Sequence, residues 1–360
     1  MFKEALCFDD VQLLDGYSTV ESRSKIDLSI QMPFNRRMKV PLIAAAMNTV
    51  VSPELGAVLL SYGAGQVFHR YCSVEDRITY CEETVELSQR ARQGVNGCAI
   101  GVTETERDVE RLITQGWADL ICIDVAACFH ESVFKQIEKV GPVCREFGAT
   151  LMVGNFSNEL FLKYLDTHPA RDYVDYIKVS QGGGSVCTTR IKTGIGKPTF
   201  QAVYDLYQIM PNMSKKYGIV ADGGIRNSGD IVKAIGAGAS MVMLGSVFAG
   251  HDECPGTSFM ENGRWYKEFS GMASAKAKAT NFQEIKNVEG VTTAVPHKGS
   301  VRETIEDLIQ CVQSGIATAG FDSLEEFIGQ GEFVRVTSAG SNEATPHSAG
   351  KLVFQHQVRG

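Results

Sequence analysis

The sequence lacks the patterns that mark several common classes of protein. None of its ten cysteines forms a Cys-x-x-Cys pair, which argues against a zinc ribbon and against a dithiol redox centre. No apolar run reaches the ~18–20 residues of a membrane span, and the first residues contain no signal-peptide core. Together with the scattered cysteines, these absences predict a cytoplasmic protein with free thiols and no membrane partner.

An excess of positive charge is also missing. The chain has 35 Lys and Arg residues against 42 Asp and Glu residues, a net charge of -7 and a pI of about 5.6. Such a balance disfavours a nucleic-acid partner. It is compatible with a small phosphorylated ligand, because one loop and one helix terminus are enough to bind a phosphate group.

Short apolar runs alternate with helical patterns along the 360-residue chain. Runs such as Leu120–Ile123 are typical of strands buried on both faces, as in a parallel sheet. The predicted strands are Pro41–Ala46, Gly65–His69, Gly97–Val102, Asp119–Val125, Thr150–Asn155, Tyr176–Ser180, Gly218–Asp222 and Ser240–Gly245. This alternation predicts an α/β fold, a (β/α)8 TIM barrel, with an open doubly wound sheet as the alternative.

The last third of the chain departs from this alternation. A long polar segment at about 251–298 is typical of a mobile flap, because structureless connections of that length are uncommon in compact domains. We expect residues 1–336 to form one catalytic barrel that includes this flap, and residues 337–360 to form a flexible tail.

A glycine-rich loop after the sixth predicted strand is the strongest local signal. Gly182, Gly183 and Gly184 allow a sharp turn and a close approach of the backbone to a ligand. Cys187 follows on this loop rather than on an apolar face. Because active sites of TIM barrels lie at the carboxyl ends of the strands, we predict that Cys187 is a reactive thiol. The alternative is an ordinary structural cysteine in a glycine-rich turn.

The seventh and eighth predicted strands end in a second pattern. Asp222, Gly223 and Gly224 follow one strand, and Gly245 and Ser246 follow the other. Loops at these two places commonly bind phosphate in TIM barrels, through backbone N–H groups. Asp222 is better suited to the hydroxyl groups of a ribose, because a carboxylate repels a phosphate. The alternative is that these glycines only form tight turns.

Asp124, at the end of the fourth predicted strand, is a further candidate for the site. The alternative is that it caps the loop that follows.

These motifs resemble those of the IMP dehydrogenase/GMP reductase family. The segments that carry the resemblance are Cys7–Val11, Ala45–Thr49, Gly184–Arg190, Asp222–Gly224, Met243–Ser246, Gly271–Ser274 and Glu289–Gly290. They extend over most of the chain. The resemblance implies a barrel, a homotetramer and a covalent intermediate between Cys187 and purine C2.

The resemblance also implies a role for each matching residue. Cys187 is the nucleophile, and Thr189 and Glu289 move the proton that the leaving group needs. The implied binding residues are Ser185, Asp222, Gly223, Gly224, Gly245, Ser246, Met272, Ala273 and Ser274 for the nucleotide, Asp124 and Arg70 for the cofactor, and the carbonyls of Gly182, Gly184 and Cys187 for a K+ ion.

Three features resemble the reductase branch of the family. The stretch Thr188–Gly196 matches that branch, no regulatory repeat module follows Arg70–Cys72, and Asn281-Phe282 stands where the dehydrogenase flap has Arg-Tyr. This implies NADPH-dependent reductive deamination of GMP to IMP. The alternatives are an NAD-dependent IMP dehydrogenase without the regulatory module, a reductase for another purine nucleotide, and a catalytically silent nucleotide-binding paralogue.

The chain also departs from the family pattern at several positions. Asn48 and Arg70 stand where Asp and Lys are usual, Gln181 and Gly183 interrupt the usual form of the loop, and Cys128 replaces a glycine. These departures imply a divergent member of the family.

Overall fold

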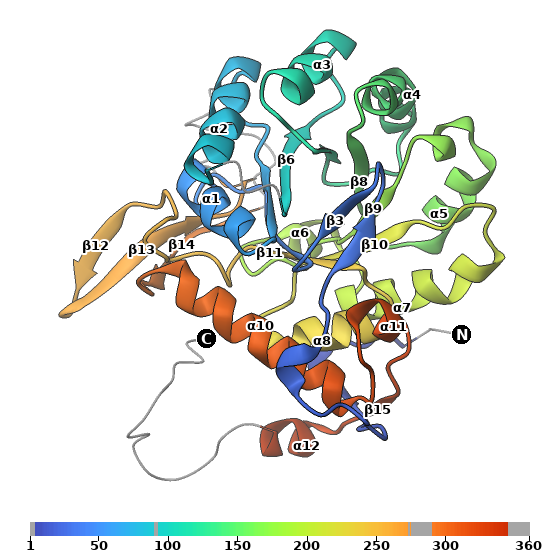
Figure 1. Ribbon diagram of the computed structural model, residues 1–360, viewed down its shortest axis with the longest axis vertical. Coiled ribbons are helices and arrows are strands. Elements are labelled where there is room, and N and C mark those ends of the chain that lie inside the picture. Colours follow the sequence, from blue (N-terminus) through green and yellow to red (C-terminus); the bar gives the residue numbers. More distant parts are fainter. Residues whose placement is uncertain (1–3, 90–92, 273, 275–289, 345–360) are drawn as a thin grey trace.

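The computed structural model describes residues 4–89, 93–272, 274 and 290–344. Its centre is a closed barrel of eight parallel strands in the order β4-β5-β6-β7-β8-β9-β10-β11, and β11 closes onto β4. Helices surround the barrel on its outside (Figure 1). The predicted TIM barrel is therefore confirmed, and closure of the sheet excludes the open doubly wound alternative.

All eight predicted strands are present, with small shifts at their ends. The barrel strands are β4 Leu42–Ala44, β5 Gly65–Phe68, β6 Val95–Ile100, β7 Leu120–Asp124, β8 Thr150–Phe156, β9 Tyr176–Val179, β10 Gly218–Asp222 and β11 Met241–Leu244. The main outer helices are α1 Pro53–Ser61, α2 Val74–Leu87, α3 Glu106–Thr114, α4 Glu131–Glu146, α5 Glu159–Thr167, α7 Thr199–Ile209, α8 Ser228–Gly236 and α10 Val301–Thr318.

Side-chain caps fix where several of these helices begin. The Ser52 hydroxyl accepts a hydrogen bond from Leu55 N, and Pro53 occupies the first turn of α1. Ser73 and Asp76 form a reciprocal capping box at the start of α2. Caps of this kind satisfy N–H groups that have no partner inside the helix, so the local sequence determines where each βα loop ends.

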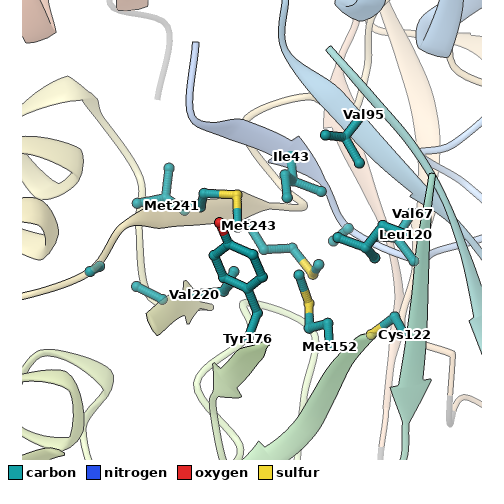
Figure 2. Close-up of a cluster of buried hydrophobic side chains, with 14 of the residues drawn as sticks. Ile43, Val67, Val95, Leu120, Cys122, Met152, Tyr176, Val220, Met241 and Met243 are labelled. Carbon is teal, nitrogen blue, oxygen red and sulfur yellow. The ribbon is translucent and has the colours of Figure 1, made fainter. Parts of the chain in front are cut away.

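Apolar side chains fill the interior of the barrel. Figure 2 shows this cluster, to which every barrel strand contributes. Its labelled members are Ile43, Val67, Val95, Leu120, Cys122, Met152, Tyr176, Val220, Met241 and Met243. Each is at most 4% exposed, so the interior is a packed core that holds the strand ends in fixed positions.

The segment at about 251–298 is not the structureless connection that its polarity suggested. Its described parts contain a three-stranded antiparallel sheet of β12 Ser258–Glu261, β13 Arg264–Ser270 and β14 Thr292–Pro296. The sheet lies beside α1 and the start of α10, and its β12-β13 end projects from the barrel (Figure 1). Asn262 and Gly263 join β12 to β13, both with positive φ, as a tight hairpin requires.

Both ends of the described chain pack against the barrel. Strand β1 Val11–Leu13 pairs with β15 Phe333–Arg335, and α11 Leu324–Phe327 packs near α8. A short helix, α12 Ser338–Glu343, begins at a Thr337 cap. Residues 338–343 of the predicted tail therefore form a short helix, and the flexibility of the tail stays a prediction. Residues 345–360 lie outside the described residues.

Two short strands lie outside the barrel on its N-terminal side in the sequence. A hairpin of β2 Ile30–Met32 and β3 Arg36–Met38 precedes the first barrel strand. Over the described ranges, no helix combines the length and the apolar character that a membrane crossing needs.

Candidate active site

Cys187 lies on the loop that follows β9, at the mouth of the barrel. Gly182 has a φ of 69°, a conformation that favours glycine, and Cys187 N donates to Gly184 O at 3.1 Å. Helix α6 Thr189–Thr193 comes next and ends at Gly194. Cys187 is partly exposed, whereas six of the ten cysteines are buried. The loop therefore presents this thiol instead of burying it.

The thiol of Cys187 contacts a second predicted catalytic side chain. Cys187 Sγ donates to Thr189 Oγ1 at 3.2 Å. Arg190, one residue further, donates from Nε to Gln181 O at 2.7 Å and thereby ties the two ends of the loop together. Burial lowers the pKa of Arg190, and the nearby Cys187 opposes that shift. The arginine holds the loop in shape and places positive charge near the sulfur.

The loops after β9 and β10 touch each other. Gly223 and Gly224 have φ values of 87° and 81°. A Cβ atom at Gly223 would lie 2.9 Å from backbone atoms of Gly183 and Gly184, closer than side chains are found. The glycine predicted as part of a phosphate cradle is therefore also required for the cradle to pack against the cysteine loop.

A cavity of about 510 Å³ opens at the carboxyl ends of the strands. This volume is within the usual range for small-molecule sites. Thirteen of the predicted site residues line it, namely Arg70, Asp124, Gly182, Gly184, Ser185, Cys187, Thr189, Asp222, Gly223, Gly224, Gly245, Ser246 and Met272. The barrel thus brings together residues predicted separately from five strand ends.

Ser274 is the exception among the described residues. It is 1% exposed and forms a bridge with Gly290, and it does not line the cavity. Ala273 and Glu289 lie outside the described residues, as do Asn281 and Phe282.

The chain on either side of the undescribed segment packs on the cysteine loop. Gly290 forms an antiparallel bridge with Cys187, and Val291 N donates to Val186 O at 3.0 Å. Gly271 N in turn donates to Val291 O at 3.0 Å. Residues from the end of β13 and the start of β14 therefore form one wall of the cavity.

A buried lysine at the base of the cavity was missed by the sequence analysis. Lys178 Nζ lies 3.0 Å from Asp124 Oδ1 and 2.9 Å from Asp222 Oδ2. The two aspartates that the sequence singled out are thus joined by one ammonium group. A charged residue inside the apolar run Tyr176–Val179 was the available signal, since a strand with both faces buried has no exposed side for it.

Arg70 and Tyr71 form the rim next to Asp124. Arg70 Nε donates to the backbone oxygen of Asp124 at 2.9 Å, and its guanidinium lies 4.5 Å from the centre of the Tyr71 ring. Met272, which also lines the cavity, accepts a hydrogen bond at its sulfur from Asn48 N at 3.2 Å. The lining of the cavity therefore combines a cationic and an aromatic side chain with an apolar one.

The chain resembles known proteins over nearly its whole length. It is 35% identical to a GMP reductase of Helicobacter pylori over 320 residues, which is 88% of this chain and 92% of the relative. It is 34% identical to GMP reductase 1 of Homo sapiens over 339 residues, 92% and 95% of the two chains.

A solved structure has the same fold. GMP reductase from Trypanosoma brucei, in complex with guanosine 5′-monophosphate, superposes with a TM-score of 0.87, 22% sequence identity and coverage of 97% of this chain and 99% of that chain. The model of the IMP dehydrogenase / GMP reductase domain matches residues 5–347. A cysteine loop over a glycine cradle and a match of this length lead to one conclusion: the chain belongs to the IMP dehydrogenase/GMP reductase family.

Proposed function

We propose that the chain is a GMP reductase, which converts GMP to IMP and ammonia with NADPH as the reductant. The observation that carries the proposal is the contact of Cys187 with Thr189 inside a cavity that also contains two glycine cradles. The relatives at 34–35% identity, which are named GMP reductases, favour this activity over IMP oxidation.

The nucleotide would be held at three places. Backbone N–H groups of Gly223, Gly224, Gly245 and Ser246 would bind the phosphate, helped by the Ser185 hydroxyl. Asp222 would accept hydrogen bonds from the ribose hydroxyls. Met272, Ala273 and Ser274 belong to the stretch proposed to bind the base. Ser274 is buried and forms a backbone bridge with Gly290, so we propose that it supports the fold of this stretch. Met272 would contact the purine ring.

The chemistry starts with the thiolate of Cys187. It adds to C2 of the purine, and the exocyclic amino group leaves as ammonia after taking up a proton. Thr189 would pass that proton, a role supported by the contact of its hydroxyl with the sulfur, and Glu289 is proposed as the source of the proton. Once C2 carries a hydride in place of the amino group, the sulfur–carbon bond breaks and Cys187 returns to the thiolate.

NADPH supplies that hydride when it is bound. Two residues that line the cavity fit such a group, because Arg70 and Tyr71 provide a cation and an aromatic ring beside Asp124. These residues would bind the cofactor and orient it next to Cys187.

The proposal also includes a K+ ion, held by the carbonyls of Gly182, Gly184 and Cys187. It further includes a homotetrameric assembly and a cytoplasmic location. Thr188 Oγ1 is buried without a hydrogen-bond partner among the described residues, so one further oxygen beside these carbonyls is open to a cation. Replacing K+ by Li+ in the assay tests the ion, and sedimentation tests the assembly.

Absorbance at 340 nm tests the activity itself. Loss of NADPH absorbance with GMP, and formation of IMP, is the expected result. Formation of NADH from IMP would instead identify a dehydrogenase. A rise in melting temperature with GMP, without turnover in either assay, would identify a binding protein and overturn the proposal.

A further inference from the structure

Three charged side chains from three strands meet at the base of the cavity. Lys178 on β9 pairs with Asp124 on β7 and with Asp222 on β10, and the side-chain amide of Asn155 on β8 also contacts its ammonium. The lysine side chain is 3% exposed, against 23% for Asp124 and 18% for Asp222. The ammonium is therefore shielded from solvent, whereas both carboxylates reach the cavity.

Strand geometry explains why Lys178 points into the barrel. Tyr176 belongs to the buried cluster of Figure 2, and side chains two residues apart on a strand lie on the same face. The same spacing relates Cys122 to Asp124 and Val220 to Asp222. The three charged residues thus form the layer directly above the apolar core.

A glycine on the neighbouring strand makes room for the lysine. A Cβ atom at Gly154 would lie 2.6 Å from Lys178 Cβ, closer than side chains approach one another. Burial by itself lowers the pKa of Lys178, but the attraction of Asp124 and Asp222 outweighs it, and the pKa is raised above the ordinary value. The lysine is therefore charged at neutral pH.

We infer that Lys178 is a positioning residue that holds Asp124 and Asp222 ionised together and in fixed orientations, so that the two sides of the cavity share one buried ammonium. The inference rests on the proposed function, in which Asp222 faces the nucleotide ribose and Asp124 faces the cofactor. It goes beyond that function because it links the two subsites electrostatically.

Removal of the ammonium would change the charge state of the pair. Both carboxylate oxygens lie about 3 Å from one nitrogen, so they are no more than about 6 Å apart, a distance at which like charges raise a pKa. Without the ammonium, repulsion between the two like charges would raise the pKa of one carboxyl group, and a protonated Asp222 would accept hydrogen bonds from ribose less well.

The other groups around Lys178 leave it the main source of positive charge for the pair. Burial raises the pKa of the Cys122 and Cys128 thiols, so both stay neutral. Arg70 approaches Asp124 from the rim, where its Nε donates to the backbone oxygen. Tyr71 is half-shielded beside Asp124, and burial raises the pKa of its hydroxyl.

The test compares Lys178→Met with the charge-preserving Lys178→Arg over pH 6–8.5, by calorimetric titration of GMP and by kcat/KM. For Lys178→Met we expect GMP affinity to fall by about tenfold or more from pH 8.5 to pH 6, beyond any change in the native protein, whereas Lys178→Arg keeps the native profile. Parallel pH profiles for the folded methionine variant and the native protein would overturn the inference.

A second variant covers the case in which Lys178→Met does not fold. In Asp124→Asn, Lys178 pairs with Asp222 alone and neutralises it more fully, so GMP should bind about threefold or more weakly even without cofactor. Unchanged GMP affinity would overturn the inference.

The two proposals fail in different ways. If the native protein binds GMP but does not oxidise NADPH, the proposed function is wrong. The measurements of GMP binding would still test the role of Lys178. A native protein that does not bind GMP removes both.

Discussion

The two ends of the barrel interior are built from the same strands but from opposite kinds of side chain. At the end away from the cavity, Met152, Tyr176 and Val220 belong to a buried apolar cluster (Figure 2). One layer higher on β9 and β10, Lys178 and Asp222 form an ion pair that borders the cavity. The comparison teaches that a step of two residues along a strand is enough to pass from a packing role to a binding role.

The difference has an energetic reason. Apolar side chains in the lower layer stabilise the fold by their removal from water and their close packing. A buried ion pair in the upper layer contributes little net stability, because its desolvation cost offsets the attraction. We therefore expect substitutions in the lower, apolar layer mainly to lower the free energy of unfolding. Substitutions at the mouth of the barrel should mainly lower activity.

Replacement of the nucleophile should have the largest effect at the mouth. Cys187→Ala removes the atom that bonds to purine C2, so kcat should fall by about 10⁴-fold or more while GMP binding stays nearly unchanged. Steady-state assays and calorimetry measure the two quantities. The matched control is Cys311→Ala, a partly exposed thiol on α10 outside the cavity. Native turnover by Cys187→Ala would remove the covalent mechanism.

Loss of the proton-transfer groups should come next. Thr189→Val keeps the shape of the side chain but removes the hydroxyl that contacts Cys187 Sγ, and kcat should drop by about 10²–10⁴-fold. Glu289→Gln should slow deamination to a similar degree. The proposed roles predict a loss in kcat; a rise in KM alone would show that these residues only bind substrate.

A substitution in the lower layer should do the reverse. Met152 is fully buried, so Met152→Ala should lower the free energy of unfolding by about 2–5 kcal/mol, measured by urea denaturation. KM for GMP should stay close to native at a temperature where the variant is folded. Met152→Leu, which nearly conserves volume, is the control and should cost less than about 1.5 kcal/mol. A large KM change in the folded alanine variant would break the distinction between the two layers.

The smallest expected effect concerns acid sensitivity near the mouth. Burial, helped by Arg77, lowers the pKa of His69 to about 4. The unfolded chain binds a proton near pH 6.5, so stability is lost as the pH falls from about 6.5 toward 4, by up to roughly 3 kcal/mol. His69→Asn should flatten the fall of the melting temperature over that range.

A second histidine offers an independent instance of the same effect. Burial, with a contribution from Lys298, also lowers the pKa of His251 to about 4. His251→Asn should therefore reduce the acid sensitivity as well. An unchanged slope in both variants would show that carboxyl groups alone cause it.

Local patterns predicted the fold well because each depends on near neighbours. The run Leu120–Ile123 lies within a single element, and the structure confirms it as part of β7. The hairpin at Asn262-Gly263 was missed although its turn has a local signal, because the polar strands around it are mostly exposed and resemble a loop.

Some features of the site could not be predicted from local patterns. Lys178 stands in an apolar strand, and only the neighbouring strands show what neutralises it. Ser274 was predicted to bind the nucleotide, but its burial against Gly290 depends on the pairing of two segments that are distant in the sequence. Interactions between strands are set by closure of the barrel, which no single window of sequence contains.

The sequence by itself determined the alternation of strands and helices, the glycine turns and the cysteine at a strand end, because backbone preference and side-chain period act over a few residues. The tertiary structure decided which strand ends meet. Only the closed barrel places Lys178 between Asp124 and Asp222 and sets the cradle of Gly223 against the cysteine loop, since these contacts join residues from different strands.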